Sequence, residues 1–316
     1  MLKKKQLADS ASDDFAADVL ASLKADPPSI SSKWLYDTQG SALFEQITGV
    51  KDYYLTRTEA TIFDEAFPAL AGMFGPGMAI TEFGSGASIK TRRLLTALEP
   101  QLYVPIDVAE EFLQEAAEDL HALFPKLEII PLVADLTAPY ELPEAFTRKN
   151  RRLGFFPGST IGNFPEEVAV QFLRGARVAM GDKAHLLISA DLVKEKDVLE
   201  RAYDDSEGVT RQFTLNLLTR MNRELSADFN IAQFRHVSRF NTEKSRIEIF
   251  VESLAAQTVS IAGEAFAFEK GDRIQTEYSY KYTQESFAQL LSQSGWEVEQ
   301  VWTDTNDWFG VFMASA

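Results

Sequence analysis

The chain has 316 residues, of which 45% are hydrophobic and 25% charged, so it can enclose a large apolar core. Its 31 basic and 47 acidic residues give a charge of −16, which argues against a nucleic-acid substrate because such proteins present a basic face to phosphate. The absence of cysteine excludes disulfides, thiolate metal sites and cysteine nucleophiles.

The sequence also indicates a location. No uninterrupted apolar stretch approaches the roughly 20 residues of a membrane span, and no apolar signal core follows the lysines at positions 3–5. A chain without cysteine fits a reducing compartment. We therefore expect a cytoplasmic protein without a membrane partner.

The N-terminal quarter predicts helices before any strand. An amphipathic helix fits Asp13–Leu23, and a short one fits Ser41–Ile47. A longer helix is expected to begin near Thr56–Thr58 and to end near Met73, with a threonine cap and Glu59 in its first turn.

After residue 75, apolar runs alternate with helical stretches. Buried parallel strands are expected at Met78–Phe83, Leu102–Ile106, Leu127–Val133, Leu153–Phe156 and His185–Ala190. The helices between them are expected at Lys90–Leu98, Ala109–Leu123 and Glu166–Met180. This order predicts an α/β fold, a parallel sheet with helices on both faces.

The pattern changes after residue 194. Two helices are expected between Glu195 and Glu224, followed by antiparallel strands over residues 231–280. Those strands are expected at Ala232–Phe240, Arg246–Glu252, Thr258–Ala262, Glu264–Phe268 and Thr276–Tyr280. The chain is expected to close with a helix and two strands, at Gln284–Gln293, Val298–Thr303 and Trp308–Met313.

Glycines follow the first predicted strand, in the run Thr81–Gly86. They allow a sharp turn and a close approach of the backbone to a bound cofactor, although a plain strand-to-helix turn has the same pattern. A dinucleotide fingerprint needs a third glycine where this chain has Ile89, which disfavours NAD and FAD. Glu82, beside the glycines, suits a cationic ligand such as S-adenosylmethionine better than a diphosphate.

Acidic residues follow the next two strands. Asp107 is placed to accept hydrogen bonds from the ribose hydroxyls of a nucleoside. Asp135 is placed to accept one from an adenine amino group, while Leu136 packs on the adenine ring. A single aspartate at such a position is ordinarily a helix cap. Glycines and acids at three consecutive strand ends favour a cofactor site instead, because ligands bind at this edge of the sheet.

Asn163 lies in the run that follows the fourth strand, Phe155–Phe164. Its amide is able to orient a substrate amine, and the alternative is that it caps the helix that starts near Pro165. The three histidines, at 121, 185 and 236, have no metal-ligand spacing and form no serine–histidine–acid set, so we expect structural roles and no metal.

Five segments carry a resemblance to the L-histidine Nα-methyltransferases of ergothioneine biosynthesis. They are Trp34–Ser41, Asp52–Arg57, Phe83–Gly86, Phe156–Phe164 and Thr276–Tyr282. The similarity covers nearly the whole chain after about residue 30, and the last two segments are far more specific than the glycine turn.

The resemblance implies a Rossmann-like class I methyltransferase core, at 56–194 and 284–316. A second, α+β substrate-binding domain would be formed by the N-terminal segment, 13–55, and a central insertion, 195–283. The implied reaction is three successive methyl transfers from S-adenosylmethionine to the α-amine of histidine, which yield its betaine, hercynine. The implied partner is a small amino acid, and a monomer is the working hypothesis.

The resemblance also assigns roles to single residues. Tyr53, Asn163 and Tyr203 would hold the α-amino and carboxylate groups of the substrate, with Tyr53 and Asn163 as the catalytic pair. Glu277 and Ser279 would meet the imidazole, with Ile249 against the ring. Around the cofactor would lie Tyr36, Gly86, Lys90, Asp107, Asp135 and Leu136, to which we add Gly84 and Gly158 at the strand ends.

Strand geometry agrees with the role of Glu277. Alternation places Thr276, Tyr278 and Tyr280 on one side of their strand, and Glu277 and Ser279 together on the other. A carboxylate that accepts from a ring N–H selects histidine over phenylalanine, which offers no such donor. The alternatives are a solvated face for Glu277 and ordinary packing for the tyrosines.

Four positions depart from the family pattern: Gln39 replaces arginine, Leu55 proline, Leu136 an aromatic residue and Ile249 methionine. Ile249 matters most because it reshapes the ring pocket. The acceptor therefore has alternatives, namely tryptophan or tyrosine, or partial methylation. A non-catalytic protein that binds S-adenosylmethionine is the alternative from another functional class.

Overall fold

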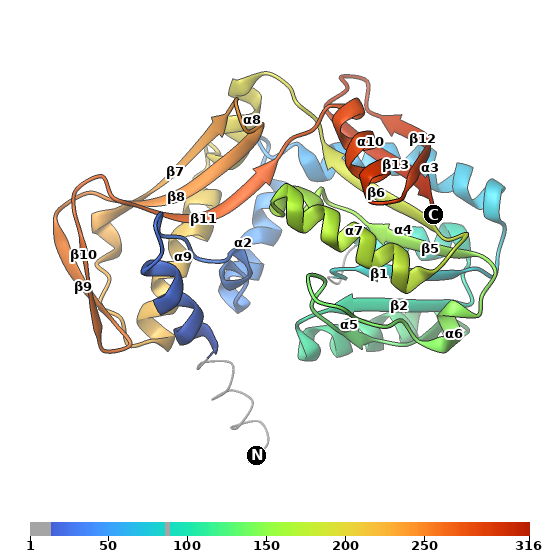
Figure 1. The fold of residues 1–316 in the computed structure, drawn as a ribbon, viewed down its shortest axis with the longest axis horizontal. Helices are drawn as coiled ribbons and strands as arrows, with labels where there is room; N and C mark the ends of the chain where they lie inside the picture. Colours follow the sequence, from blue (N-terminus) through green and yellow to red (C-terminus); the bar gives the residue numbers. More distant parts are fainter. Residues whose placement is uncertain (1–13, 86–88) are drawn as a thin grey trace, which may run out of the picture. The chain divides into compact units, whose positions relative to one another are not determined.

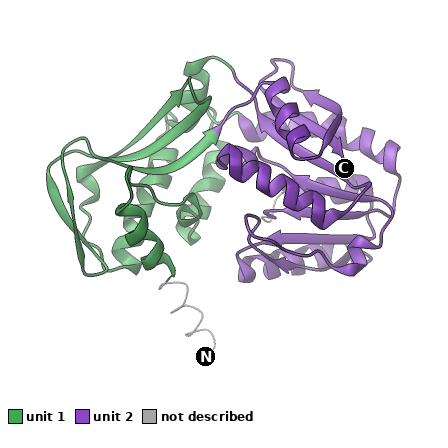
Figure 2. Ribbon diagram, in the orientation of Figure 1, with its two compact units in different colours: residues 1–54, 194–279 green, residues 55–193, 280–316 purple. Residues whose placement is uncertain are grey.

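The computed structural model describes residues 14–85 and 89–316, and the chain divides into two compact units (Figures 1 and 2). Unit 1 consists of Met1–Tyr54 and Lys194–Ser279, and unit 2 of Leu55–Val193 and Tyr280–Ala316. The boundaries expected from sequence, after residues 55, 194 and 283, differ from these by one to four residues. The assignment of one unit to the cofactor and the other to the substrate stays a prediction.

Unit 2 is built on an eight-stranded sheet in the order β12-β13-β6-β5-β1-β2-β3, with β4 also paired to β2. Its strands are β1 (Ala79–Phe83), β2 (Leu102–Asp107), β3 (Glu128–Ile129), β4 (Leu132–Val133), β5 (Arg152–Phe156), β6 (His185–Asp191), β12 (Glu297–Thr303) and β13 (Phe309–Ser315). Strands β1 to β6 pair in parallel, and β13 runs antiparallel to both β6 and β12.

The chain leaves β1 toward β2 and returns to β5 on the other side of β1, so the strand order reverses between β1 and β5. Ligands of open α/β sheets bind at such a reversal, at the carboxyl ends of the strands. The predicted parallel sheet is confirmed, and the reversal indicates where its ligand site lies.

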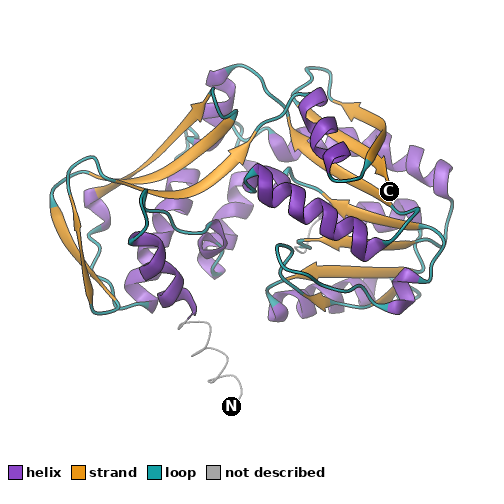
Figure 3. Ribbon diagram, viewed as in Figure 1, coloured by secondary structure: helices purple, strands orange, loops and turns teal. Residues whose placement is uncertain are grey.

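Helices cover both faces of this sheet (Figure 3). They are α3 (Leu55–Phe74), α4 (Ile89–Leu98), α5 (Glu110–Leu123), α6 (Glu144–Thr147), α7 (Glu166–Met180) and α10 (Gln284–Gln293), with a 3-10 turn η2 at Thr160–Asn163. On one face, α6, α7 and α10 contribute to an apolar core with Phe156 and Phe312. On the other face, Phe63 and Phe67 of α3 pack against Phe155.

Unit 1 combines helices with two small sheets. Its helices are a segment over residues 14–23, η1 (Ser32–Leu35), α2 (Thr38–Gly49), α8 (Lys196–Tyr203), α9 (Val209–Glu224) and η3 (Ile231–Gln233). Its strands are β7 (Phe234–Asn241), β8 (Arg246–Ser253), β9 (Gln257–Ile261), β10 (Glu264–Phe268) and β11 (Arg273–Tyr280). They form a three-stranded sheet, β11-β8-β7, and a β9-β10 hairpin, and helix α9 packs against α2 and β7.

Two sequence expectations are wrong in detail. The single strand predicted at Leu127–Val133 is two short strands, because Pro131 has no N–H to donate to a ladder. The helix expected near Thr56 begins at Leu55, so the threonines lie inside it and Glu59 is not in its first turn. Within residues 14–85 and 89–316, no helix has the length and apolarity to cross a membrane.

Candidate functional site

The turn after β1 has the geometry expected of a cofactor loop. Gly84 has a φ of +69°, a conformation that L side chains rarely adopt, and its N–H and that of Ser85 both donate to the Ile106 carbonyl at 2.9 Å. A Cβ placed on Gly84 would meet no other atom within 4 Å, so the backbone faces open space there. Gly86 lies outside the described residues.

The two predicted acids lie at the carboxyl ends of β2 and β4, as expected. Asp107 is the last residue of β2 and is half-buried, which raises its pKa, and its Oδ1 accepts from the Ala109 N–H at 3.0 Å. Asp135 is exposed, and its Oδ1 accepts from the N–H and hydroxyl of Thr137 at 2.8 and 2.6 Å. Leu136 is half-buried beside it. Carboxylates of this kind accept from ribose hydroxyls and an adenine amine, so this edge of the sheet fits a nucleoside.

Lys90 and Gly158, both predicted near the cofactor, lie against each other. The Lys90 ammonium forms an ion pair with Glu59 of α3, and the Gly158 N–H donates to the same carboxylate at 2.6 Å. A Cβ on Gly158 would lie 3.5 Å from the Lys90 Nζ. Sequence reasoning missed Glu59, which it interpreted as a residue of the first helical turn.

Asn163 ends the η2 turn and is half-buried. The alternative that it caps α7 is wrong, because Pro165 is the N-cap of that helix and no side chain caps it. Its predicted role, orienting a substrate amine, stays a prediction.

Glu82 does not face the glycine turn as the sequence suggested. Its carboxylate is buried, with 1% of the residue exposed, and accepts from Thr91 Oγ1 at 2.9 Å and from the Tyr103 hydroxyl at 2.7 Å. It therefore ties α4 and β2 to β1. Burial raises its pKa from 4.5 to about 7, against the hydrogen bonds from Tyr103 and Thr91, which favour the charged form.

This raised pKa predicts a pH-dependent stability. The folded protein binds the Glu82 proton more tightly than the unfolded chain, so this contribution to stability is complete below about pH 4.5 and is lost as the pH rises through about 7. We expect the free energy of unfolding of Glu82→Gln, relative to wild type, to increase by about 2 kcal/mol between about pH 5.5 and pH 8.

Urea unfolding at the two pH values measures the difference. Glu115→Gln, which changes an exposed carboxylate on α5, is the control and should follow wild type. Parallel pH dependences for wild type and Glu82→Gln would contradict the assignment.

The predicted substrate residues of unit 1 form a polar and aromatic cluster. The Tyr203 hydroxyl and Ser279 Oγ share a hydrogen bond of 2.7 Å, and both residues are buried. The ring of Tyr53, also buried, meets that of Tyr203 edge-on with centroids 6.1 Å apart. Helix α8, strand β11 and the segment before α3 thus bring these three side chains together.

Tyr36 and Glu277 belong to the same cluster. Desolvation and the negative charge of Glu277 raise the pKa of Tyr36, with smaller contributions from Tyr53 and Tyr203. Of the Tyr36 surface, 39% is exposed. Its ring packs edge-on against Phe213. Glu277 is half-buried, and its predicted contact with the substrate ring stays a prediction.

Ile249 lies on β8 beside this cluster and is 2% exposed. Its carbonyl accepts from Thr276 Oγ1 at 3.2 Å, which places it next to the strand that carries Glu277 and Ser279. The departure from the family pattern therefore lies at a closely packed position.

His236 contacts the backbone of Tyr203, a member of this cluster. Its Nε2 lies 2.8 Å from the Tyr203 carbonyl, so it donates there, and Nδ1 accepts from the Thr214 hydroxyl at 3.0 Å. Burial lowers the pKa of His236, which keeps the ring neutral. Sequence reasoning gave it a structural role without a partner, because a lone histidine in a strand gives no signal of what it contacts.

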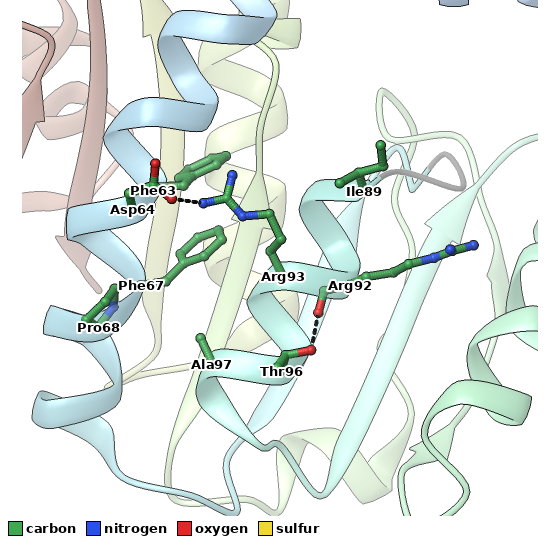
Figure 4. Close-up of a pocket in the computed structure, with 9 residues that line it drawn as sticks. All are labelled: Phe63, Asp64, Phe67, Pro68, Ile89, Arg92, Arg93, Thr96 and Ala97. Carbon is green, nitrogen blue, oxygen red and sulfur yellow. Dashed lines mark hydrogen bonds and ion pairs between the residues drawn. The ribbon is translucent and has the colours of Figure 1, made fainter.

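A shallow groove of about 390 Å³ lies elsewhere in unit 2, between α3 and α4 (Figure 4). Phe63 and Phe67 line one side, and Arg93 crosses the groove to pair with Asp64. Ile89, 77% exposed, lies at its end. The residues that line it include none of the predicted site residues, and we assign no ligand to it.

A Rossmann-like sheet, with an open glycine turn and two carboxylates at its carboxyl edge, fits a nucleoside cofactor such as the S-adenosylmethionine of class I methyltransferases. Residues 15–316 match the family described as "Histidine-specific methyltransferase, SAM-dependent". The chain belongs to this family, and the cofactor predicted from sequence is confirmed.

The similarity to known proteins extends over nearly the whole chain. Histidine N-alpha-methyltransferases of Mycolicibacterium smegmatis and Mycobacterium tuberculosis are each 37% identical to it, over 97% and 94% of this chain and 96% and 94% of theirs. An N-methyltransferase of Aspergillus fumigatus is 27% identical over 92% of this chain and 81% of its own. A solved magnesium protoporphyrin IX methyltransferase of Synechocystis PCC 6803 aligns with a TM-score of 0.47 at 13% identity, over 88% and 94% of the chains.

Proposed function

We propose that this enzyme methylates the α-amino group of L-histidine three times and releases hercynine, as in ergothioneine biosynthesis. The observation that carries the proposal is the similarity, over nearly the full length, to two histidine N-alpha-methyltransferases. The cluster of Tyr53, Tyr203, Glu277 and Ser279 in unit 1 supports it, because those side chains suit a small zwitterion with a polar ring.

The cofactor, when bound, supplies an electrophilic methyl group on a sulfonium. Asp107 would accept hydrogen bonds from the ribose hydroxyls, and Asp135 would accept one from the adenine amine. Leu136 would pack on the adenine ring. Gly84, Gly86 and Gly158 would let the backbone approach the cofactor. Lys90 and Tyr36 complete the proposed set.

The residues around the substrate act by positioning. Tyr53 and Tyr203 donate hydroxyl hydrogens to a carboxylate without adding a cation that would repel the sulfonium. The Asn163 amide accepts from the attacking amine, which must be neutral, and loses these contacts as methyl groups replace hydrogens. The α-ammonium must lose one proton before each of the three transfers, and in this proposal water takes it, with no side chain assigned as base. Fixing the neutral amine in line with its electrophile lowers the barrier mainly by orientation.

A second candidate keeps the chemistry and changes the acceptor. Ile249 stands where the family pattern has methionine, and it is fully packed on β8. A stiffer, branched side chain changes which ring fits, so tryptophan or tyrosine is the alternative acceptor.

One incubation tests the function. The protein is mixed with S-adenosylmethionine and each amino acid separately, and product masses are read by mass spectrometry. We expect trimethylated histidine as the main product. A main product from another amino acid would establish the second candidate, and no product from any amino acid would contradict both.

Asn163→Ala and Tyr53→Phe are the matched variants for this assay. Both should keep cofactor affinity while methyl transfer falls, because they remove contacts to the amine and carboxylate alone. If they lost thermal stability and kept full activity, these residues would be packing elements rather than substrate ligands.

We further propose that the enzyme acts as a monomer in the cytoplasm. The family name supports a small-molecule substrate. The acidic composition argues against a nucleic-acid partner.

A further inference from the structure

Glu59 is a buried carboxylate that the proposed mechanism does not use. It lies on α3, and 0% of it is exposed. A buried ionised carboxylate is costly unless charged or hydrogen-bonding partners compensate for the lost water. Its partners therefore indicate what it is there to hold.

Three groups from three separate elements converge on this carboxylate. The Lys90 ammonium comes from α4, the Gly158 N–H from the turn after β5, and the Ser189 hydroxyl from β6. The N–H and hydroxyl contacts measure 2.6 and 2.5 Å. Two of the three groups belong to residues in the proposed cofactor set.

The conformation of Gly158 links the position of this turn to that of the Lys90 ammonium. Its φ of +82° turns its N–H toward Glu59, and a Cβ there would approach the Lys90 Nζ to 3.5 Å. The carboxylate thus sets the position of a backbone turn and of a cation at the same time. Losing it would release both.

The turn is also held from its other side. Ser189 Oγ accepts from the Ser159 N–H at 3.3 Å, and Ser159 Oγ accepts from the Asp191 N–H at 2.8 Å. Asp191 in turn pairs with Lys281 at 2.7 Å, and both side chains are fully buried. Ser189 Oγ also donates to Glu59, but the contact between Ser159 Oγ and the Asp191 N–H does not involve that carboxylate. The fold should therefore survive a change at Glu59 while the turn shifts.

We propose that Glu59 is a positioning residue for the cofactor, acting through Lys90 and the Gly158 turn. The inference rests on the proposed function only in that S-adenosylmethionine binds at this edge of unit 2. Glu59 itself touches no ligand in this proposal. Its role is to place one cation and one loop.

Glu59→Gln tests the proposal with little change in shape. The amide oxygen can still accept from the Gly158 N–H, but the ion pair with Lys90 is lost. Glu82→Gln is the matched control, because it changes another buried carboxylate of unit 2 whose hydrogen-bond partners, Thr91 and Tyr103, are outside the cofactor set. The charges of Lys90 and Glu59 also act on Glu82, but less than these two hydrogen bonds. Calorimetry gives the Kd for S-adenosylhomocysteine, and thermal melting reports the fold.

The Glu59→Gln substitution is expected to raise this Kd about tenfold or more, against less than about threefold for Glu82→Gln. Lys90→Met should also raise it, and Glu59→Gln/Lys90→Met should do no more than Lys90→Met alone, because coupled residues are not additive. If Glu59→Gln does not fold, the double variant, which removes both charges, is compared with Lys90→Met in its place.

An unchanged Kd in Glu59→Gln, additive effects, or an equal rise in Glu82→Gln would overturn the inference. A rise beyond that of Lys90→Met in the double variant would do the same. Failure of the wild-type enzyme to bind S-adenosylhomocysteine would defeat the proposed function as well. Wild-type binding with an unaffected Glu59→Gln would defeat this inference alone.

Discussion

Replacing Asp107 with alanine is expected to weaken the binding of S-adenosylmethionine roughly ten- to hundredfold, because hydrogen bonds to a charged group contribute about 1.5–3 kcal/mol. The carboxylate lies at the end of β2, half-buried, at the edge where the strand order reverses. Alanine offers the ribose hydroxyls no side-chain acceptor in place of the carboxylate. Calorimetric titration of the folded variant measures the loss.

Asp107→Asn separates charge from shape. Its side-chain oxygen can keep the 3.0 Å bond from the Ala109 N–H that orders the start of α5, so any loss in this variant belongs to the ligand. We expect an intermediate affinity. Two folded variants with wild-type affinity would remove Asp107 from the cofactor site. NAD should not bind to either variant or to wild type.

Most of the fold follows from local patterns. Continuous apolar runs separated by amphipathic stretches identify buried parallel strands and their helices, and helix α7 and strand β10 match their predicted bounds. Proline was the feature that misled: Pro131 divides one predicted strand into β3 and β4. The pattern of apolar residues is the same on both sides of it, so periodicity does not reveal the break.

The residues alone predicted the candidate site at the strand ends, whereas Tyr53, Tyr203 and Ser279 came from the family resemblance. Asp107 ends β2 and Asp135 follows β4, because position along the chain fixes position at the sheet edge. Glu59 was missed because its partners Gly158 and Ser189 are 99 and 130 residues away. A charged residue on a helix predicts a solvated face, and only the packed structure shows that this one is buried.

Glu277 is expected to carry the discrimination between amino acids. It is half-buried and its charge reaches the Tyr36 hydroxyl, so it lies inside the tyrosine cluster. An imidazole N–H can donate to it, whereas an apolar ring cannot, which penalises phenylalanine by roughly 1–3 kcal/mol, about five- to 150-fold. Glu277→Ala should therefore lower activity on histidine and shrink its advantage over phenylalanine and tryptophan.

Ile249 acts on the same choice through shape alone. It is packed on β8 next to Thr276, and methionine there would be longer and more flexible, so Ile249→Met should change which ring fits while methyl transfer continues. The measurement is a competition among equimolar histidine, tyrosine, tryptophan and phenylalanine with wild type, Glu277→Ala and Ile249→Met. If the preference ratios of Glu277→Ala equalled those of wild type, Glu277 would not contact the ring. A wild-type preference for another amino acid would move the acceptor and leave the reaction class in place, because the contacts proposed for the amine do not depend on the ring.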